Sequence, residues 1–264
     1  MQLRIAAAAT LALLTGTANA ALHPGDLAFT AFNADEDGFA VVALREIAPF
    51  SGVYFTDNEW SGGAPGTGAF NTGESTFVWA TGSMPIAPGT VVRFSRIDQA
   101  SRNVSIGAFA LVVSGAPGFS ASGDTVYAYS GANASQPEQL IAALSSENYA
   151  GSSLAGSGLV PGVNAVTVGN GADFAEYTGA RNGLASFGAY GGLLNDPGQW
   201  HSQLTGEFAT TVPNLNNFSV AAVPEPQTYA LLATGLGLIG WRLRRRARDR
   251  APSVLPLLRD ARVR

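Results

Sequence analysis

Oxygen-bearing side chains alternate near the start of the chain, at Asn33, Asp35 and Asp37. Calcium-binding loops begin this way, because oxygens on every second residue converge on one ion and a following glycine, here Gly38, permits a sharp turn. Asp57 and Glu59 are further candidate ligands. An acidic hairpin turn explains the same residues, since Leu44 stands where a bidentate Glu is expected and strands flank the segment. Calcium and a plain turn both stay open.

Two tryptophans, Trp60 and Trp200, each stand beside a glycine-containing turn. Exposed indole rings stack on the apolar faces of sugars, so both are candidates for contact with a glycan. Core packing is the competing interpretation. We expect it for Trp79, which alternates within an apolar segment.

Residues suited to catalysis are scarce. The chain has no cysteine and no lysine, and His23 and His201 are its only histidines. Thiolate nucleophiles, lysine Schiff bases and cysteine-based metal clusters are therefore excluded, and neither an HExxH motif nor a Gly-x-Ser-x-Gly elbow occurs. We expect no enzyme activity and no cofactor other than calcium. A carbohydrate hydrolase is the alternative, since it needs only two facing carboxylates.

Charge divides the chain into two unlike parts. Nine of the fifteen arginines lie beyond residue 241. Between Ala21 and Val223, five arginines stand against sixteen acidic residues, a net charge of −11. A surface of that sign repels phosphate backbones, so we expect no nucleic-acid binding. The abundant Gly, Ser, Thr and Asn of the same part favour hydrogen bonds to a neutral polysaccharide.

Residues 1–20 have the three parts of a secretory signal peptide. Arg4 supplies the positive charge, residues 5–14 form the apolar stretch, and Ala18-Asn19-Ala20 is the small-x-small pattern that signal peptidase accepts. The apolar stretch is too short to span the ~30 Å hydrocarbon layer of a membrane. We therefore expect export, with Ala18 and Ala20 marking the cleavage site.

A second apolar run, residues 229–241, precedes an arginine cluster at Arg242, Arg244, Arg245 and Arg246. As a helix this run covers only about 20 Å. We expect a minimal transmembrane helix, helped by snorkelling arginines or local thinning of the bilayer. The positive-inside rule then keeps the cluster in the cytoplasm and leaves the rest of the chain outside the inner membrane.

Immediately before that run stand Pro224, Glu225 and Pro226. With the glycine-containing helix and the arginines, this segment resembles the PEP-CTERM sorting signal of Gram-negative bacteria over residues 223–248. The resemblance implies that an exosortase recognises the motif, removes the tail and delivers the protein to the cell surface. Two prolines also favour an extended site that a protease can bind. Residues 249–264 form a basic tail that family members usually lack.

Short β-branched and aromatic segments alternate with turn-forming residues between the two ends. The expected strands are 27–32, 39–44, 53–56, 75–80, 90–95, 109–113, 125–130, 165–168 and 218–221. Residues 137–144 have helix composition, with Leu140, Ile141 and Leu144 on one face. The pattern predicts an all-β, immunoglobulin-like sandwich over residues 21–222, with one short helix.

The first predicted strands and turns carry a second resemblance. Residues 25–29, 33–39, 53–60, 88–92 and 122–129 resemble the lamin-tail-like, immunoglobulin-type sandwich of secreted bacterial proteins. The resemblance implies this fold over about residues 24–200. It implies no particular activity, because fold alone does not give function.

These features predict an exported cell-surface or extracellular-matrix protein, such as a biofilm component, that an exosortase sorts. Its body is expected to be a non-catalytic binding or structural module. Signal peptidase and exosortase are the expected processing partners, the inner membrane holds the precursor, and extracellular polysaccharide is a candidate ligand. A secreted carbohydrate-active enzyme and a calcium-stabilised adhesin are the alternatives.

Overall fold

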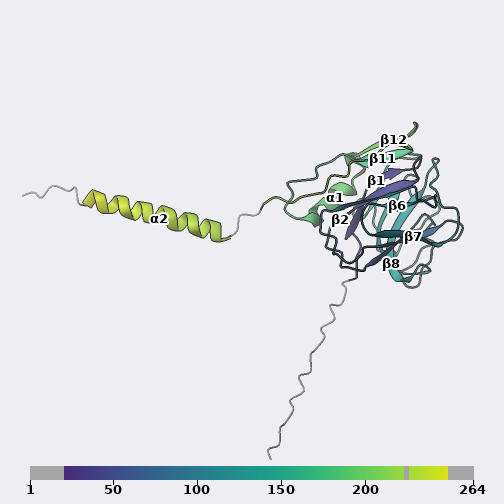
Figure 1. Ribbon diagram of the computed structural model, residues 1–264, viewed down its shortest axis with the longest axis horizontal. Coiled ribbons are helices and arrows are strands. Elements are labelled where there is room, and N and C mark those ends of the chain that lie inside the picture. Colours follow the sequence, from purple (N-terminus) through teal and green to yellow (C-terminus); the bar gives the residue numbers. More distant parts are fainter. Residues whose placement is uncertain (1–20, 223–225, 249–264) are drawn as a thin grey trace, which may run out of the picture. The chain divides into compact units, whose positions relative to one another are not determined.

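Figure 1 shows the computed structural model of the chain, which describes residues 21–222 and 226–248. The chain divides into two units between Ala221 and Ala222. The first unit, the body, contains β1 (Leu27–Asn33), β2 (Gly38–Ala43), β3 (Gly52–Thr56), β4 (Thr76–Ala80), β5 (Val91–Ser95), β6 (Asn103–Val104), β7 (Ala108–Val113), β8 (Thr125–Asn133), β9 (Gln136–Ser145), β10 (Ala165–Thr167), β11 (Phe174–Tyr177) and β12 (Trp200–Gln203). Its short helical turns are η1 (Phe187–Ala189), α1 (Tyr190–Leu194) and η2 (Pro197–Gln199).

The strands form two six-stranded sheets. The strand order is β12-β11-β1-β2-β5-β6 in the first sheet and β10-β9-β8-β3-β4-β7 in the second. Paired strands are antiparallel, except that β9 and β10 run parallel. This arrangement confirms the predicted all-β sandwich.

Side chains from the facing surfaces of the sheets form the main hydrophobic core. Along β8, Val126 and Ala128 point into this core, whereas Tyr127 and Tyr129 belong to a separate cluster on the opposite face. A strand imposes this alternation because its side chains have a period of two residues. Burial of so many apolar side chains stabilises a body that has no disulfide.

Both outer faces of the sandwich are covered as well. On the first sheet, Tyr190 and Phe218 pack against the strands. On the second sheet, the loops after β3 and β9 bring Trp60 and Tyr149 over the outward tyrosines of β8. All the clusters lie between residues 22 and 218, so residues 21–222 contain a complete core and form a self-contained folding unit.

Residues 137–144, predicted as a helix, belong to strand β9. This strand lies between β8 and β10, with one aromatic or aliphatic cluster on each face, so Leu140, Ile141 and Leu144 are all buried. Burial on both faces removes the alternation that marks a half-exposed strand. The helix prediction is therefore wrong. The sequence pattern also fails to predict strands β6, β11 and β12. Residues 218–221, predicted as a strand, lie outside both sheets.

The second unit contains the helix α2 (Pro226–Arg248). The predicted apolar run and arginine cluster both lie on this helix, where Leu231, Leu236 and Trp241 are 73%, 61% and 60% exposed. Among the helices within residues 21–222 and 226–248, none has both the length and the apolar character needed to cross a membrane.

Candidate functional site

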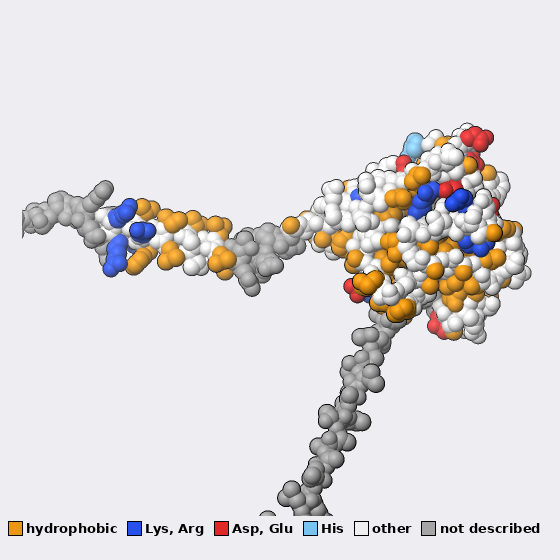
Figure 2. All heavy atoms as spheres, viewed as in Figure 1, with side chains coloured by type: hydrophobic (Ala, Val, Ile, Leu, Met, Phe, Trp, Pro, Cys, Tyr) orange, Lys and Arg blue, Asp and Glu red, His pale blue; other side chains and the backbone are white. Residues whose placement is uncertain are grey.

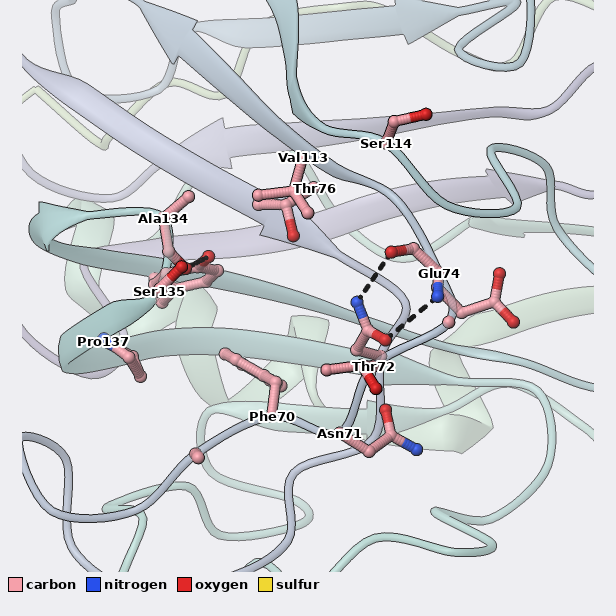
Figure 3. A pocket seen from close by; sticks show the side chains of 14 residues that line it. Phe70, Asn71, Thr72, Glu74, Thr76, Val113, Ser114, Ala134, Ser135 and Pro137 are labelled. Atoms are coloured by element: carbon pink, nitrogen blue, oxygen red, sulfur yellow. Dashed lines mark hydrogen bonds between the residues drawn. The ribbon is translucent and has the colours of Figure 1, made fainter.

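A hollow of about 210 Å³ opens on the outer face of the second sheet, and we call it the Phe70 pocket. Side chains of β4, β7 and β8 contribute to its base, and the loop 69–74 and the turn 134–137 form its rims. In Figure 3, Phe70 and Thr72 of the loop lie on one side, and Ser135 and Pro137 lie on another. The pocket therefore combines residues that are far apart in the sequence.

Reciprocal hydrogen bonds hold the loop of this pocket. Asn58 Nδ2 donates to the carbonyl oxygen of Glu74, and Asn58 Oδ1 accepts from the Glu74 N–H, both at 3.1 Å (Figure 3). Asn71 Oδ1 accepts from the Glu59 N–H at 3.0 Å, and Asn71 Nδ2 donates to the Glu59 carboxylate. Because Asn58 is buried, these bonds fix the end of the loop and shape the pocket before any ligand binds.

The Phe70 pocket joins an aromatic ring to amide and hydroxyl groups. The Phe70 ring packs on Trp60 and on Tyr129, with ring centroids 5.0 Å apart in each pair. Of the described residues that line the pocket, Glu74 alone is charged, and burial together with Glu59 raises the pKa of Glu74. Such a site suits a small, neutral, polar ligand. The signal that could have revealed it is Phe70 itself, the only aromatic residue between Trp60 and Phe77.

The structure corrects the predicted role of Trp60, whereas glycan contact at Trp200 stays a prediction. Trp60 is 0% exposed and packs beneath Phe70, so its ring cannot stack on a glycan. Trp200 is half-buried, and its indole N–H donates to the Leu194 carbonyl oxygen at 2.8 Å. Trp79 lies in the main core, as predicted. A turn residue beside a tryptophan in the sequence did not expose the ring, because loops fold back over the outer face of the second sheet.

The candidate calcium ligands near the start of the chain do not converge on one point. Asn33 Nδ2 donates to the Phe208 carbonyl oxygen at 2.9 Å, and Asp35 accepts from the Phe208 N–H at 2.7 Å. Asp37 instead accepts from the Phe119 N–H at 2.5 Å. Within residues 21–222 and 226–248, no group of three or more acidic or histidine side chains has the geometry to hold a metal ion. These side chains fix the turn between β1 and β2 and the loops beside it.

Asp57 and Glu59 also have separate surroundings. The Glu59 carboxylate bonds to Asn71, whereas Asp57 is 4% exposed and neither of its carboxylate oxygens has a hydrogen-bond partner among the described residues. Burial raises the pKa of Asp57 to about 9, with Asp124 and other acids adding to the effect. Asp57 is therefore protonated at neutral pH, because no positive charge compensates its burial.

The segment before the Pro-Glu-Pro motif is attached to the body. The Arg181 guanidinium carbon lies 4.9 Å from the centroid of the buried Phe218 ring. Arg181 also donates to the Asn216 carbonyl oxygen at 2.9 Å, and burial lowers the pKa of Arg181. The Ala221 N–H donates to the Leu184 carbonyl oxygen at 2.8 Å. Contacts with the body thus continue to within three residues of the motif.

Of the residues predicted to direct processing, the structure describes Pro226 but not the others in the Pro-Glu-Pro motif or at the signal-peptide cleavage site. Pro224 and Glu225 lie outside the described residues, as do Ala18 and Ala20 of the predicted signal-peptide cleavage site. Pro226 is the first residue of α2. Proline is favoured there because the first helical residues have no intrahelical partner for an N–H. The helix therefore begins at the second proline of the motif.

The four predicted membrane-orienting arginines lie in the last third of α2 and are exposed: Arg242, Arg244, Arg245 and Arg246. The Arg245 guanidinium carbon is 5.0 Å from the Trp241 ring centroid. Figure 2 shows the basic side chains gathered at one end of this helix, with apolar side chains along the rest. Positive charge at the carboxyl end also complements the helix dipole.

Residues 222–246 match the PEP-CTERM protein-sorting motif. No curated protein and no solved structure matches the chain, so the lamin-tail-like resemblance of the body stays a prediction. The matched segment begins directly after Ala221, whose N–H bonds to the Leu184 carbonyl oxygen, and it includes the apolar run and the arginine cluster. This motif implies an exosortase as processing partner and export through a membrane-anchored precursor. The chain thus carries, at its carboxyl end, the PEP-CTERM sorting signal of an exosortase system.

Proposed function

We propose that this protein is a cell-surface or extracellular-matrix component whose body is a non-catalytic module that binds neutral polysaccharide. The observation that carries this proposal is the Phe70 pocket. Sugar rings present apolar C–H faces that pack on aromatic rings, and hydroxyl groups that exchange hydrogen bonds with polar side chains. Phe70 supplies the first kind of contact, and Thr72, Ser114 and Ser135 supply the second.

The size and charge of the pocket support this ligand class. Its volume of about 210 Å³ is below the roughly 300–1,000 Å³ of sites for drug-sized ligands, so it suits one ring or a chain end. The net charge of −11 between Ala21 and Val223 disfavours anionic polymers. A neutral sugar meets no such repulsion.

The arrangement of carboxylates supports binding over hydrolysis. A glycosidase places two carboxyl groups about 5–9.5 Å apart on opposite sides of the bond that it cleaves. The lining of the Phe70 pocket includes one carboxylate, that of Glu74, which points away from Phe70 in Figure 3. Glu59 does not line the pocket, and its carboxylate is hydrogen-bonded to Asn71.

The exposed apolar side chains of α2 support a membrane-bound stage before processing. Leu232, Leu238 and Ile239 are each about 60% exposed. Apolar surface of this extent is stable only when lipid or protein covers it. Cleavage by the exosortase would then separate the body from this helix and release it to the surface or the matrix.

Co-sedimentation with a neutral polysaccharide fraction from the producing cells' own matrix tests the ligand. Residues 21–222 should bind saturably. Ser114→Trp and Ser135→Trp fill the pocket and should weaken binding at least about tenfold, a loss of ~1.4 kcal/mol. Ser83→Trp adds the same ring at an exposed turn outside the lining and is the control. Equal binding by all variants would refute the proposed site, and release of reducing sugars would refute the non-catalytic role.

A further inference from the structure

Strand β7 lies at the edge of the second sheet, beside β4. Apart from this pairing, no residue of β7 makes a backbone hydrogen bond within the described residues. Alternate N–H and C=O groups of an edge strand point away from the sheet. Strand β7 therefore presents a row of free donors and acceptors along one side.

This edge lacks the features that protect the others. Strands β6, β10 and β12 have two, three and four residues, whereas β7 has six. Ala108, Ala110, Val112 and Val113 are exposed, and no charged residue or strand proline interrupts β7. Its bulge, opposite Thr76 and Phe77, leaves residues 108–111 regularly paired. Natural sheets normally protect an edge of this length with charge, proline or a covering segment.

Charge indicates what covers the edge. No charged residue occurs from Asn103 to Gly123, whereas the body as a whole is strongly acidic. Two copies of the body therefore repel each other over most of their surfaces but not at β7.

We propose that β7 pairs with β7 of a second copy of this chain, in antiparallel orientation about a two-fold axis. Each strand supplies the hydrogen-bonding groups that the other lacks, and the second sheets of the two bodies become one continuous sheet. Six residues from each copy make a small interface, below the ~1,200 Å² of a stable complex. Pairing is therefore weak in dilute solution and strengthened by crowding at the cell surface. It would link sugar-binding bodies in a matrix but does not depend on the Phe70 pocket.

Sedimentation velocity of residues 21–222 at about 1–100 μM, the range of a weak interface, tests this pairing. The wild-type body should shift from monomer to dimer as its concentration rises. Ala110→Lys places a charge on the exposed side of β7 and should leave a monomer throughout. Ala132→Lys puts the same charge on an exposed position of β8, in the β8–β9 hairpin, and should dimerise as wild type does. A wild-type monomer at all concentrations, or dimerisation of Ala110→Lys, would overturn the proposal.

Oxidative cross-linking gives a second test, because the chain has no cysteine of its own. Ala108→Cys and Ala110→Cys sample two registers of antiparallel pairing, and Ala132→Cys is the control. A disulfide needs Cα atoms within about 7 Å, so at least one β7 variant should form covalent dimers about tenfold faster than the control. Equal rates at β7 and at residue 132 contradict the pairing, even if Ala110→Lys proves too unstable to analyse.

Discussion

Three aspartates with raised pKa values have no salt-bridge partner among the described residues: Asp37, Asp57 and Asp124. Burial raises the pKa of Asp37 to about 6, of Asp124 to about 7 and of Asp57 to about 9. The salt bridges of the described residues, Arg45 with Asp26 and Arg93 with Glu36, involve none of the three. Asp37 and Asp124 accept backbone hydrogen bonds from residues 119 and 120, whereas Asp57 has no partner. Of these three carboxyl groups, Asp57 is therefore expected to destabilise the folded body most.

We predict that Asp57→Asn raises the free energy of unfolding at pH 8 by at least about 1.4 kcal/mol, the value of one pKa unit, because Asp57 must take up a proton on folding at this pH and an amide need not. The amide has nearly the same shape but cannot ionise. Urea denaturation of residues 21–222 measures the change. Glu138→Gln, at an exposed position of β9, makes the same change in charge and should leave stability nearly unaltered. A less stable Asp57→Asn body would contradict this interpretation.

The same pKa shifts determine whether the free energy of unfolding rises or falls with pH. The pKa of Asp57 rises on folding from 3.8 to about 9, and that of Asp124 from 3.8 to about 7, so folding takes up protons. Their stabilising contribution is complete below pH 3.8 and is lost as the pH rises through about 7 and then about 9. Stability should fall between pH 5 and about 9, and the curve for Asp57→Asn should be flatter. A wild-type curve that rises over this range would exclude the assignment.

At the scale of elements, the extended segment 214–221 lies outside the two sheets and is held by side chains and by isolated backbone hydrogen bonds to the body. Arg181 is central, because its guanidinium lies over Phe218 and donates to the Asn216 carbonyl oxygen. The Tyr190 hydroxyl adds a hydrogen bond to the Ser219 carbonyl oxygen at 2.6 Å. This segment connects the folded body to the sorting motif.

We predict that Arg181→Ala lowers the free energy of unfolding by about 1–3 kcal/mol, through loss of a buried cation–π contact and a charged hydrogen bond. Hydrogen exchange of residues 216–221 should accelerate more than exchange of β1. Arg45→Ala is the matched control, because the Arg45 side chain is 63% exposed and its pairing with Asp26 is long, at 3.9 Å. Unchanged exchange in Arg181→Ala would show that other contacts hold the segment.

Elements with alternating or strongly apolar patterns could be predicted from the sequence. Strands β1 to β5, β7, β8 and β10 overlap predicted segments. Strand β9 could not be separated from a helix, because burial on both faces removes the period of two residues. Strand β12 has the mixed sequence of a short edge, and its pairing with β11 depends on distant residues.

The candidate sites were also predictable only where their residues follow one another along the chain. The Pro-Glu-Pro segment, its helix and the arginines follow one another along the chain, so their order alone identifies the motif. The Phe70 pocket instead combines the loop after β3 with the β8–β9 turn and with β7. Local sequence indicated Trp60 as the exposed aromatic residue, but the chain folds so that Phe70 covers it. Proximity of this kind is set by strand order, which residue spacing does not reveal.

At the scale of the whole molecule, the two units have separate tasks. The body contains a complete core and the pocket, and α2 contains exposed apolar and basic residues that belong to the sorting signal. Because Pro224, Glu225 and Pro226 lie beyond Ala221, the last residue of the body, cleavage there would free the body without breaking the contacts that hold residues 214–221. The body would then act outside the cell as a folded module.

Processing of the full chain in its own cells tests this account most directly. Cells expressing wild type, Pro224→Ala with Pro226→Ala, or the neighbouring control Gln227→Ala are fractionated and probed for the body. The account predicts a shortened body at the surface or in the medium for wild type and Gln227→Ala. It predicts a longer, membrane-bound form for the double variant. Normal size and release of the double variant would contradict sorting through this motif.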